Sequence, residues 1–309
     1  MKLYKIEDKS VKLVSPSTFK LEKDIQTLVE DNLTELFQIQ FVKSEYSIKN
    51  FRIDTLGYNK ETKAFVIIEY KKERNFSVID QGYTYLSLLL NNKADFVLEY
   101  NENCNTILRK DDIDWSQSRV IFISPNFTEY QKHSVNFRDV PFELWEIKRY
   151  ENNLIGLVEH KTNSEESIST ISDDIRSVVS QVSKEVKVYD EEYHFNQNKN
   201  RNEKIVELYK QLKERILNLP DVEVSPKGTY ISFRNKRPFV DVVIYNEGLY
   251  TIINMKKDTL NDPEKLMKDV SDKGHWGNGD YSTTIYPDTD LDYVMFLINQ
   301  SYKNQAKGS

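Results

Sequence analysis

The sequence holds few of the features that mark secreted or membrane-bound proteins. Cys104 is the single cysteine among 309 residues, which excludes an internal disulfide and a cysteine-based zinc site. No apolar run approaches the roughly 18 residues that a membrane-spanning helix needs. The opening residues, MKLYKIEDKS, lack the apolar core of a secretion signal. We therefore expect a cytoplasmic protein with no membrane partner.

Glycine and proline are also scarce, at 9 and 8 residues, so low-complexity linkers are not expected. Hydrophobic residues make up 39% and charged residues 30%, a composition typical of a folded globular protein. The net charge of −6 argues mildly against a nonspecific nucleic-acid coat, because phosphate binding depends on Lys and Arg. It does not exclude a nuclease, since the carboxylates of such an enzyme bind metal.

Two further classes of site are missing. No Gly-rich phosphate loop ending in Gly-Lys-Ser/Thr occurs, so the sequence supplies no recognisable nucleotide motor. His133, His160 and His194 lack the spacing of metal ligands, and we interpret them as incidental.

Apolar periodicity predicts an α/β domain with a mixed sheet over residues 1–160. Helical spacing predicts helices at residues 21–37, 77–91 and 126–134. Strand patterns cover residues 40–48, 51–56, 64–71, 95–100, 119–124, 142–150 and 154–160.

A change of composition follows. Residues 161–200 are polar and poor in apolar side chains, and we interpret them as a partly helical linker. Residues 201–309 are predicted to form a smaller α+β domain. Its expected helices cover residues 203–219, 263–270 and 290–302, and its expected strands cover residues 229–233, 239–244, 249–255 and 282–285.

The chemistry rests on Asp54, followed fifteen residues later by Glu69 and then by Lys71. Alternation along a strand puts Glu69 and Lys71 on one face, at the end of a strand that is apolar on both faces. Buried charges in such a place are usually paired or bound to metal. With the turn centred near residues 60 and 61, Asp54 lies opposite Ile67, about 7–8 Å from its diagonal neighbour Glu69. A one-residue slip in register would move Asp54 to the other face.

Oxygen ligands favour Mg²⁺ or Mn²⁺. Such a metal polarises a phosphodiester and lowers the pKa of a bound water, while Lys71 could orient that water or stabilise developing charge. Glu-x-Lys alone is weak evidence, because an exposed ion pair has the same sequence and little energetic consequence. Gln81 and Tyr85 stand four residues apart on one face of the next helix. Their alternative interpretation is an ordinary amphipathic helix with a buried tyrosine.

The stretch RIDTLGYNKETKAFVIIEYKKERNFSVIDQGYTYLSLL resembles PD-(D/E)XK nucleases, and among them the nuclease domain of archaeal mismatch and branched-DNA endonucleases. The family pattern is a helix glutamate, then Asp, Glu-x-Lys and Gln-x-x-x-Tyr. Ile53 stands where many members have proline. The resemblance implies that Asp54, Glu69 and Lys71 form the catalytic core, that Gln81 and Tyr85 support it, and that Glu22 completes the metal site, with Glu45 as the second choice for that role.

The resemblance further implies a restriction-endonuclease-like mixed sheet flanked by helices. It implies a Mg²⁺- or Mn²⁺-dependent endonuclease that hydrolyses DNA in restriction, phage defence or repair. A homodimer and a defence-system partner protein are compatible with this interpretation. The alternative is a noncatalytic nucleic-acid or protein-binding scaffold of a defence complex, against which the intact Asp, Glu and Lys argue.

The second domain carries the segments FVDV, DVS, GHWGNGDY and LDYV, which resemble an uncharacterised bacterial domain often labelled a transport protein. Without a membrane segment we set transport aside and expect DNA or partner binding. His275 and Trp276 could contact a base or phosphate, although a core position for Trp276 and a backbone contact for His275 are favoured. The remaining candidates for nucleic-acid contact are Lys72, Arg74, Lys256 and Lys257.

Overall fold

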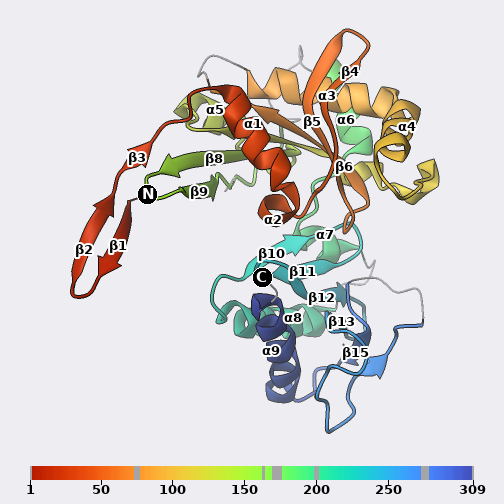
Figure 1. The fold of residues 1–309 in the computed structure, drawn as a ribbon. Helices are drawn as coiled ribbons and strands as arrows, with labels where there is room; N and C mark the ends of the chain where they lie inside the picture. Colours follow the sequence, from red (N-terminus) through yellow and green to blue (C-terminus); the bar gives the residue numbers. More distant parts are fainter. Residues whose placement is uncertain are drawn as a thin grey trace. The chain divides into compact units, whose positions relative to one another are not determined.

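The computed structural model describes residues 2–72, 77–161, 164–168, 176–197, 202–272 and 278–307. The chain divides into two compact units, Met1–Val188 and Tyr189–Ser309 (Figure 1). No helix in the described ranges is long and apolar enough to span a membrane.

The first unit is built on a mixed sheet, as expected. The strands β6 (Ala64–Tyr70), β7 (Arg119–Ser124) and β8 (Phe142–Tyr150) run parallel to one another. Antiparallel strands flank them: β5 (Phe51–Asn59) and β4 (Gln40–Ile48) beside β6, and β3 (Pro16–Ser17) and β9 (Leu154–Glu159) beside β8. The strands β1 (Leu3–Glu7) and β2 (Ser10–Val14) form a separate antiparallel hairpin.

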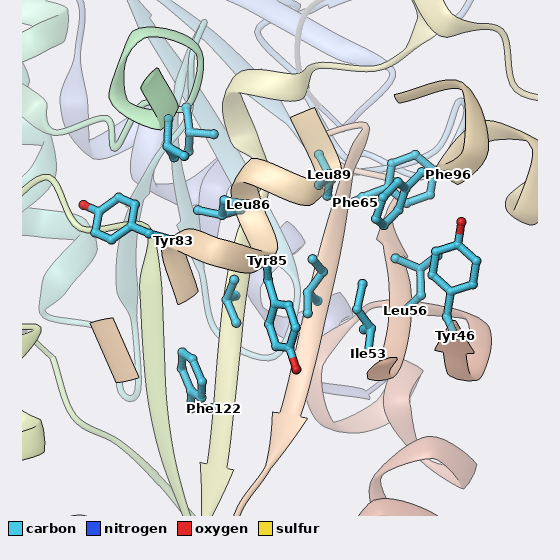
Figure 2. Close-up of a cluster of buried hydrophobic side chains, with 14 of the residues drawn as sticks. Tyr46, Ile53, Leu56, Phe65, Tyr83, Tyr85, Leu86, Leu89, Phe96 and Phe122 are labelled. Carbon is cyan, nitrogen blue, oxygen red and sulfur yellow. The ribbon is translucent and has the colours of Figure 1, made fainter. Parts of the chain in front are cut away.

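Helices cover both faces of this sheet. On one face, α1 (Glu22–Asp31) and α2 (Leu33–Phe37) pack against Val66, Ile68 and Tyr70 of β6. On the other, α3 (Val78–Asn91) and α4 (Lys93–Asn103) pack against Phe65 and Ile67 (Figure 2). Two 3₁₀ turns, Lys110–Asp112 and Trp115–Gln117, precede β7 in the chain, and the short α5 (Glu129–Ser134) follows β7. Every residue of β6 is buried, which confirms the prediction of a central strand.

Two elements differ from the sequence prediction. The helix expected at residues 21–37 is divided at Asn32 into α1 and α2. The strand expected at residues 95–100 is wrong, because this stretch belongs to α4. Phe96 and Tyr100, four residues apart, are buried while Leu98 is 57% exposed, and this is the spacing of one helical face.

The linker expected at residues 161–200 is not an independent region. Within it, α6 (Arg176–Glu185) packs on α3, and Val179 and Val182 join the core of the first unit. The helix α7 (Glu191–Asn196) belongs to the second unit. Apolar residues at helical spacing within a polar stretch therefore extend the first unit to Val188.

The second unit is an α+β fold on an antiparallel sheet. The strand order is β10 (Glu223–Pro226), β11 (Ile231–Arg234), β12 (Pro238–Ile244), β13 (Leu249–Ile253), β15 (Tyr281–Ile285) and β14 (Lys268–Asp269). Apolar side chains of the helices α8 (Glu203–Leu217) and α9 (Leu291–Lys307) pack against the sheet and form the hydrophobic core with it.

The helix expected at residues 263–270 is wrong. The Asp262 carboxylate accepts the backbone N–H groups of Leu266 and Met267, and Lys265 has a φ of 55°. A left-handed residue interrupts any right-handed helix at this point. The segment instead turns into the short strand β14.

Candidate active site

Asp54 and Glu69 meet across the hairpin of β5 and β6. The register pairs Thr55 with Ile68, and its continuation by one residue puts Asp54 directly opposite Glu69. The prediction placed Asp54 opposite Ile67. The turn occupies residues 60–63, one position later than expected, because the Asn59 side chain accepts the N–H of Thr62 at 2.9 Å. The register therefore shifts by two residues, which keeps Asp54 on the expected face.

Glu69 is a buried carboxylate with one satisfied oxygen, and its side chain is 3% exposed. Its Oε1 accepts from the Lys71 ammonium at 2.6 Å and from the Gln81 amide at 2.6 Å. Within the described part of the chain, no donor reaches its Oε2. A buried acceptor without a partner costs free energy, so this oxygen marks a place where a ligand would be favoured.

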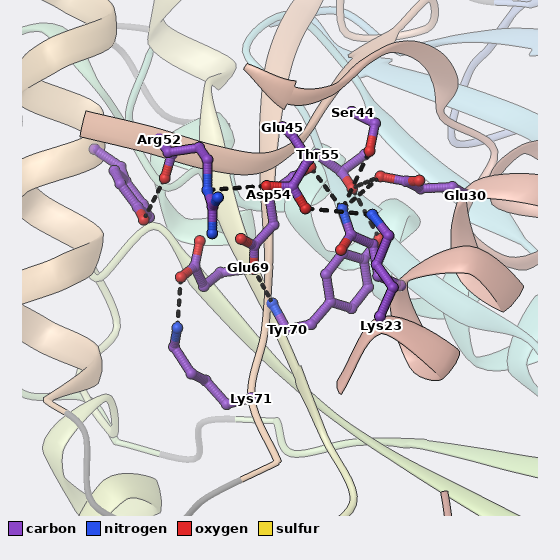
Figure 3. A network of polar contacts seen from close by, with 12 residues as sticks. Lys23, Glu30, Ser44, Glu45, Arg52, Asp54, Thr55, Glu69, Tyr70 and Lys71 are labelled. Carbon is purple, nitrogen blue, oxygen red and sulfur yellow. Dashed lines mark hydrogen bonds and ion pairs between the residues drawn. The ribbon is translucent and has the colours of Figure 1, made fainter. Parts of the chain in front are cut away.

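Asp54 lies beside this carboxylate, as Figure 3 shows. Its Oδ2 accepts the N–H of Tyr70 at 3.0 Å. Burial and, next, the charge of Glu69 raise the pKa of Asp54 to about 7, against the lowering effects of the Tyr70 N–H and Lys71. The two carboxyl groups thus form a like-charge pair that a cation would stabilise.

Lys71 supplies a permanent positive charge next to this pair. Burial lowers its pKa, but the nearby carboxylates, Glu69 first, outweigh burial and the pKa of Lys71 is raised. Lys71 is therefore protonated at neutral pH. It can donate hydrogen bonds and stabilise negative charge, whereas it cannot act as a general base.

Gln81 and Tyr85 tie helix α3 to both strands of the site. The Gln81 Nε2 group that contacts Glu69 also donates to the Tyr85 hydroxyl at 3.0 Å, and that hydroxyl donates to the Arg52 carbonyl at 3.2 Å. Burial raises the pKa of Tyr85, so its hydroxyl stays protonated. The two side chains share one helical face and meet at the site, as the four-residue spacing predicts.

The two candidates for a third acidic ligand are engaged elsewhere. Glu22, in the first turn of α1, accepts the N–H of Lys72 at 2.7 Å. Glu45 on β4 pairs with Arg52 at 2.9 Å and with Lys23 at 3.3 Å. No group of three or more His, Cys, Asp and Glu side chains that could hold a metal occurs in the described ranges. The structure therefore brings two of the expected acidic ligands together and leaves Glu22 at the neighbouring strand end.

The Asp54–Glu69 pair nevertheless fits a divalent cation. It offers carboxylate oxygens, including the unpartnered Glu69 Oε2, and the mutual repulsion of the two groups would be relieved by a positive ion. Water molecules commonly complete the coordination of Mg²⁺ at such sites.

A polar network on the opposite face of the sheet fixes the backbone at Asp54 (Figure 3). The Gln26 Nε2 group of α1 donates to the Asp54 carbonyl at 3.0 Å. The Thr55 hydroxyl donates to Glu30 at 2.5 Å and lies 3.2 Å from the Tyr70 hydroxyl. The sequence analysis missed this network, because only the docking of α1 on the sheet brings these residues together.

The expected nucleic-acid contacts are spread over both units. The Lys72 ammonium donates to the Lys20 carbonyl, beside the candidate site. Lys256 is exposed in the second unit, and Lys257 pairs there with Asp269 at 3.0 Å and with Asp272 at 3.8 Å. Arg74, His275 and Trp276 lie outside the described residues.

Other charged residues near the site were not anticipated. Arg52 precedes Asp54 by two residues on β5 and therefore shares its strand face, a signal that strand alternation offered. Glu146, Lys148, Lys132 and His160 gather on and beside β8. Only the parallel pairing of β7 with β8 shows that they lie on the same sheet face as Glu69.

Comparison with known proteins identifies one relative that matches over nearly the whole chain. The chain is 46% identical over 306 residues to an uncharacterised protein of Haemophilus influenzae (strain ATCC 51907 / DSM 11121 / KW20 / Rd), with 98% of this chain and 100% of that protein covered. The chain belongs to the same family as that protein. Residues 191–305, within the second unit, match the model of a domain of unknown function, DUF5655.

Solved structures give a weaker likeness. EndoMS in its dsDNA2 complex is 16% identical, with a TM-score of 0.27. The match covers 42% of this chain and 44% of the EndoMS chain. A repair endonuclease from Pyrococcus abyssi is 20% identical, with a TM-score of 0.26. The match covers 38% of this chain and 44% of the endonuclease chain. Because these scores are low, the fold assignment rests on the strand order and not on these likenesses.

Proposed function

We propose that the first unit is a Mg²⁺- or Mn²⁺-dependent endodeoxyribonuclease that hydrolyses phosphodiester bonds. Asp54 and Glu69 would hold the metal, with Glu22 at the adjacent strand end able to assist through water. The metal, when bound, would polarise the phosphodiester and acidify water. A role in restriction, phage defence or repair belongs to the same proposal.

The side chains of the chain itself have distinct tasks in this proposal. Lys71, protonated at neutral pH, donates to the phosphodiester oxygen on which charge develops. Gln81 holds Glu69 Oε1 through a 2.6 Å hydrogen bond and so fixes the direction of the unpartnered Oε2. The Tyr70 N–H orients the Asp54 carboxyl group. The site thus presents two carboxylates and one cation without rearrangement.

A single observation carries the proposal: the buried Glu69, with one oxygen lacking a donor in the described residues, lies beside the partly buried Asp54 carboxyl group and next to a protonated lysine. An ordinary surface ion pair would not bring a second, partly buried carboxyl group with a raised pKa beside the first. This arrangement matches the order of the PD-(D/E)XK pattern in the sequence.

The test is a cleavage assay of the wild type and Glu69→Gln with Mg²⁺ or Mn²⁺. Substrates are plasmid, linear, single-stranded and modified DNA. We expect the wild type to cut at least one of them and Glu69→Gln to lose about 10³-fold in rate, which corresponds to about 4 kcal/mol of transition-state stabilisation. Equal cutting by both proteins would refute the assigned metal site.

Thermal unfolding separates this function from the scaffold alternative. Mn²⁺ should raise the Tm of the wild type and not that of Glu69→Gln, because a ligand that binds only the folded state stabilises it. If the wild type neither cuts any substrate nor gains stability with metal, the noncatalytic scaffold is the better description.

A further inference from the structure

A second charged cluster lies at the same edge of the sheet as the candidate active site. It consists of Glu146 on β8 with Lys132 from α5, Lys148 from β8 and His160 after β9. We call it the Glu146 cluster. The proposed metal site uses none of these residues.

The strand register places this cluster in line with the active site. Glu69 pairs with Phe122, and Phe122 with Leu144, across the parallel strands β6, β7 and β8. Two residues further along, on the same face, Ser124 pairs with Glu146, and continuing the β6–β7 register by one residue puts Lys71 beside Ser124. Neighbouring strands lie about 4.8 Å apart, so the backbones at Lys71 and Glu146 are about 10 Å apart. The strands β6 and β7 end here, at Tyr70 and Ser124, whereas β8 continues beyond Glu146 to Tyr150. The carboxyl ends of parallel strands are the usual edge for ligand binding in such sheets.

Glu146 organises the cations around it. Its Oε1 lies 3.0 Å from His160 Nε2 and 3.7 Å from the Lys132 ammonium, and its Oε2 lies 3.2 Å from the Lys148 ammonium. The Phe127 N–H also donates to Oε1, at 3.4 Å. Unlike Glu69, Glu146 thus has cationic or N–H neighbours on both oxygens. Both oxygens of the Glu146 carboxylate therefore have favourable neighbours, and no metal ion is needed to stabilise its charge.

Two lysines and a histidine surround the one carboxylate that anchors them. The side chains of Lys132, Lys148 and His160 are 28%, 36% and 25% exposed, while that of Glu146 is 11% exposed. Glu129 also pairs with Lys132 at 3.1 Å, but it is 79% exposed, and exposed pairs contribute little. Two partly exposed lysine side chains are therefore held in place around one largely buried carboxylate, in a chain whose net charge is −6. Fixed cations lose less side-chain entropy when an anion binds.

We infer that the Glu146 cluster is a phosphate-binding subsite for the DNA strand that enters the active site. This inference rests on the proposed function, since it takes the ligand to be the same polyanion. Lys132 and Lys148 would contact a phosphate away from the cleaved bond. Glu146 is a positioning residue that holds the two lysines in place.

The test measures DNA binding in the Glu69→Gln background without divalent metal, so that it depends on neither cleavage nor metal. Fluorescein-labelled duplex and single-stranded oligonucleotides are titrated by anisotropy at a series of KCl concentrations. A plot of log K against log salt has a negative slope. Each lost phosphate contact reduces the magnitude of that slope by about 0.9 for duplex and about 0.7 for single strands. We expect Lys148→Ala to reduce the magnitude of the slope by the amount for one contact, and Lys132→Ala/Lys148→Ala to reduce it by the amount for two contacts.

Two controls match this design. Lys9→Ala/Lys12→Ala removes the same charge from the exposed β1–β2 hairpin and should leave the slope unchanged. Lys132→Arg/Lys148→Arg keeps both charges and should also retain it. Thermal unfolding checks folding, and the half-exposed Lys148→Ala serves alone if the double variant does not fold.

Each outcome decides the inference. A slope for Lys132→Ala/Lys148→Ala equal to that of the hairpin control overturns it, as does the lack of salt-dependent DNA binding in the parent protein. A protein that cuts DNA but shows no change in slope refutes the subsite alone. If the wild type neither cuts DNA nor gains stability with Mn²⁺, but the lysine variants lose the expected salt dependence, the phosphate-binding site is kept and the nuclease is refuted.

Discussion

The first unit contains two Glu-x-Lys tripeptides on parallel strands, and they lie in opposite environments. Glu69-Tyr70-Lys71 ends β6, and Glu146-Ile147-Lys148 lies within β8. Both glutamates are buried on the same sheet face, and each has a lysine two residues later as an ion-pair partner. The local sequence therefore does not distinguish them.

Their neighbours do. Glu69 faces Asp54 and keeps one oxygen without a donor in the described residues. Glu146 faces Lys132, Lys148 and His160. Burial alone would raise the pKa of Glu146, but hydrogen bonds from Lys148 and His160 hold it below its ordinary value. A carboxylate surrounded by donors stabilises a fold, whereas one beside a second carboxylate is suited to a cation.

The largest effect should come from removing the Gln81 amide, which contacts Glu69 and has no counterpart beside Glu146 among the described contacts. The expected effect is on metal affinity. Gln81→Ala removes the 2.6 Å hydrogen bond that orients Glu69. Loss of such an orienting partner typically costs 10–100-fold in metal affinity, roughly 1.4–2.7 kcal/mol. The measurement is the Mn²⁺ concentration that gives half-maximal stabilisation or cleavage. Tyr85→Phe, which keeps the ring and the Gln81–Glu69 bond, should shift it less, and an unchanged midpoint for Gln81→Ala would remove Gln81 from the site.

A matched pair of isosteric variants should change stability in opposite directions. Asp54→Asn relieves repulsion from Glu69 and should raise the free energy of unfolding in EDTA by at least about 1 kcal/mol. Glu146→Gln weakens its charge-assisted bonds to Lys148 and His160 and should lower it by about 1–3 kcal/mol. Each variant replaces a carboxyl group with an amide of nearly the same shape, so changes in packing cancel in the comparison. Urea unfolding at neutral pH measures both, and changes of the same sign would show that the two environments do not differ as described.

The smallest effect concerns pH. Because the pKa of Glu146 is lowered in the folded protein, its ion pairs contribute stability above its ordinary value of 4.5. That contribution is lost as pH falls through the lowered pKa, when the unfolded state binds the proton more readily. The Tm difference between the wild type and Glu146→Gln should therefore shrink as pH falls from 6 toward 3, by about a degree or a few. A difference that stays constant over this range would mean that the carboxylate charge is not what stabilises the fold.

The accuracy of the sequence prediction followed the kind of interaction involved. The elements β4, β6, β7 and β8 lie within a residue of their predicted bounds, because their apolar patterns are regular and their ends carry turn residues. The prediction was wrong for α4, whose aromatic and β-branched residues suit a strand as well as a helix. It was also wrong for residues 263–270, where the Asp262 side chain competes for the backbone N–H groups that a helix would use.

By itself, the sequence determined a two-part chain, a central strand buried on both faces, and the order Asp54, Glu69, Lys71, Gln81, Tyr85 along it. These features depend on composition and on contacts between residues close in the chain. Only the tertiary structure decided that Asp54 lies directly opposite Glu69, that Glu22 is engaged with the Lys72 backbone, and that α6 belongs to the first unit. It also decided that Glu146 has cationic neighbours. Parallel pairing and helix docking join residues far apart in sequence, and no local pattern specifies which charges then become neighbours.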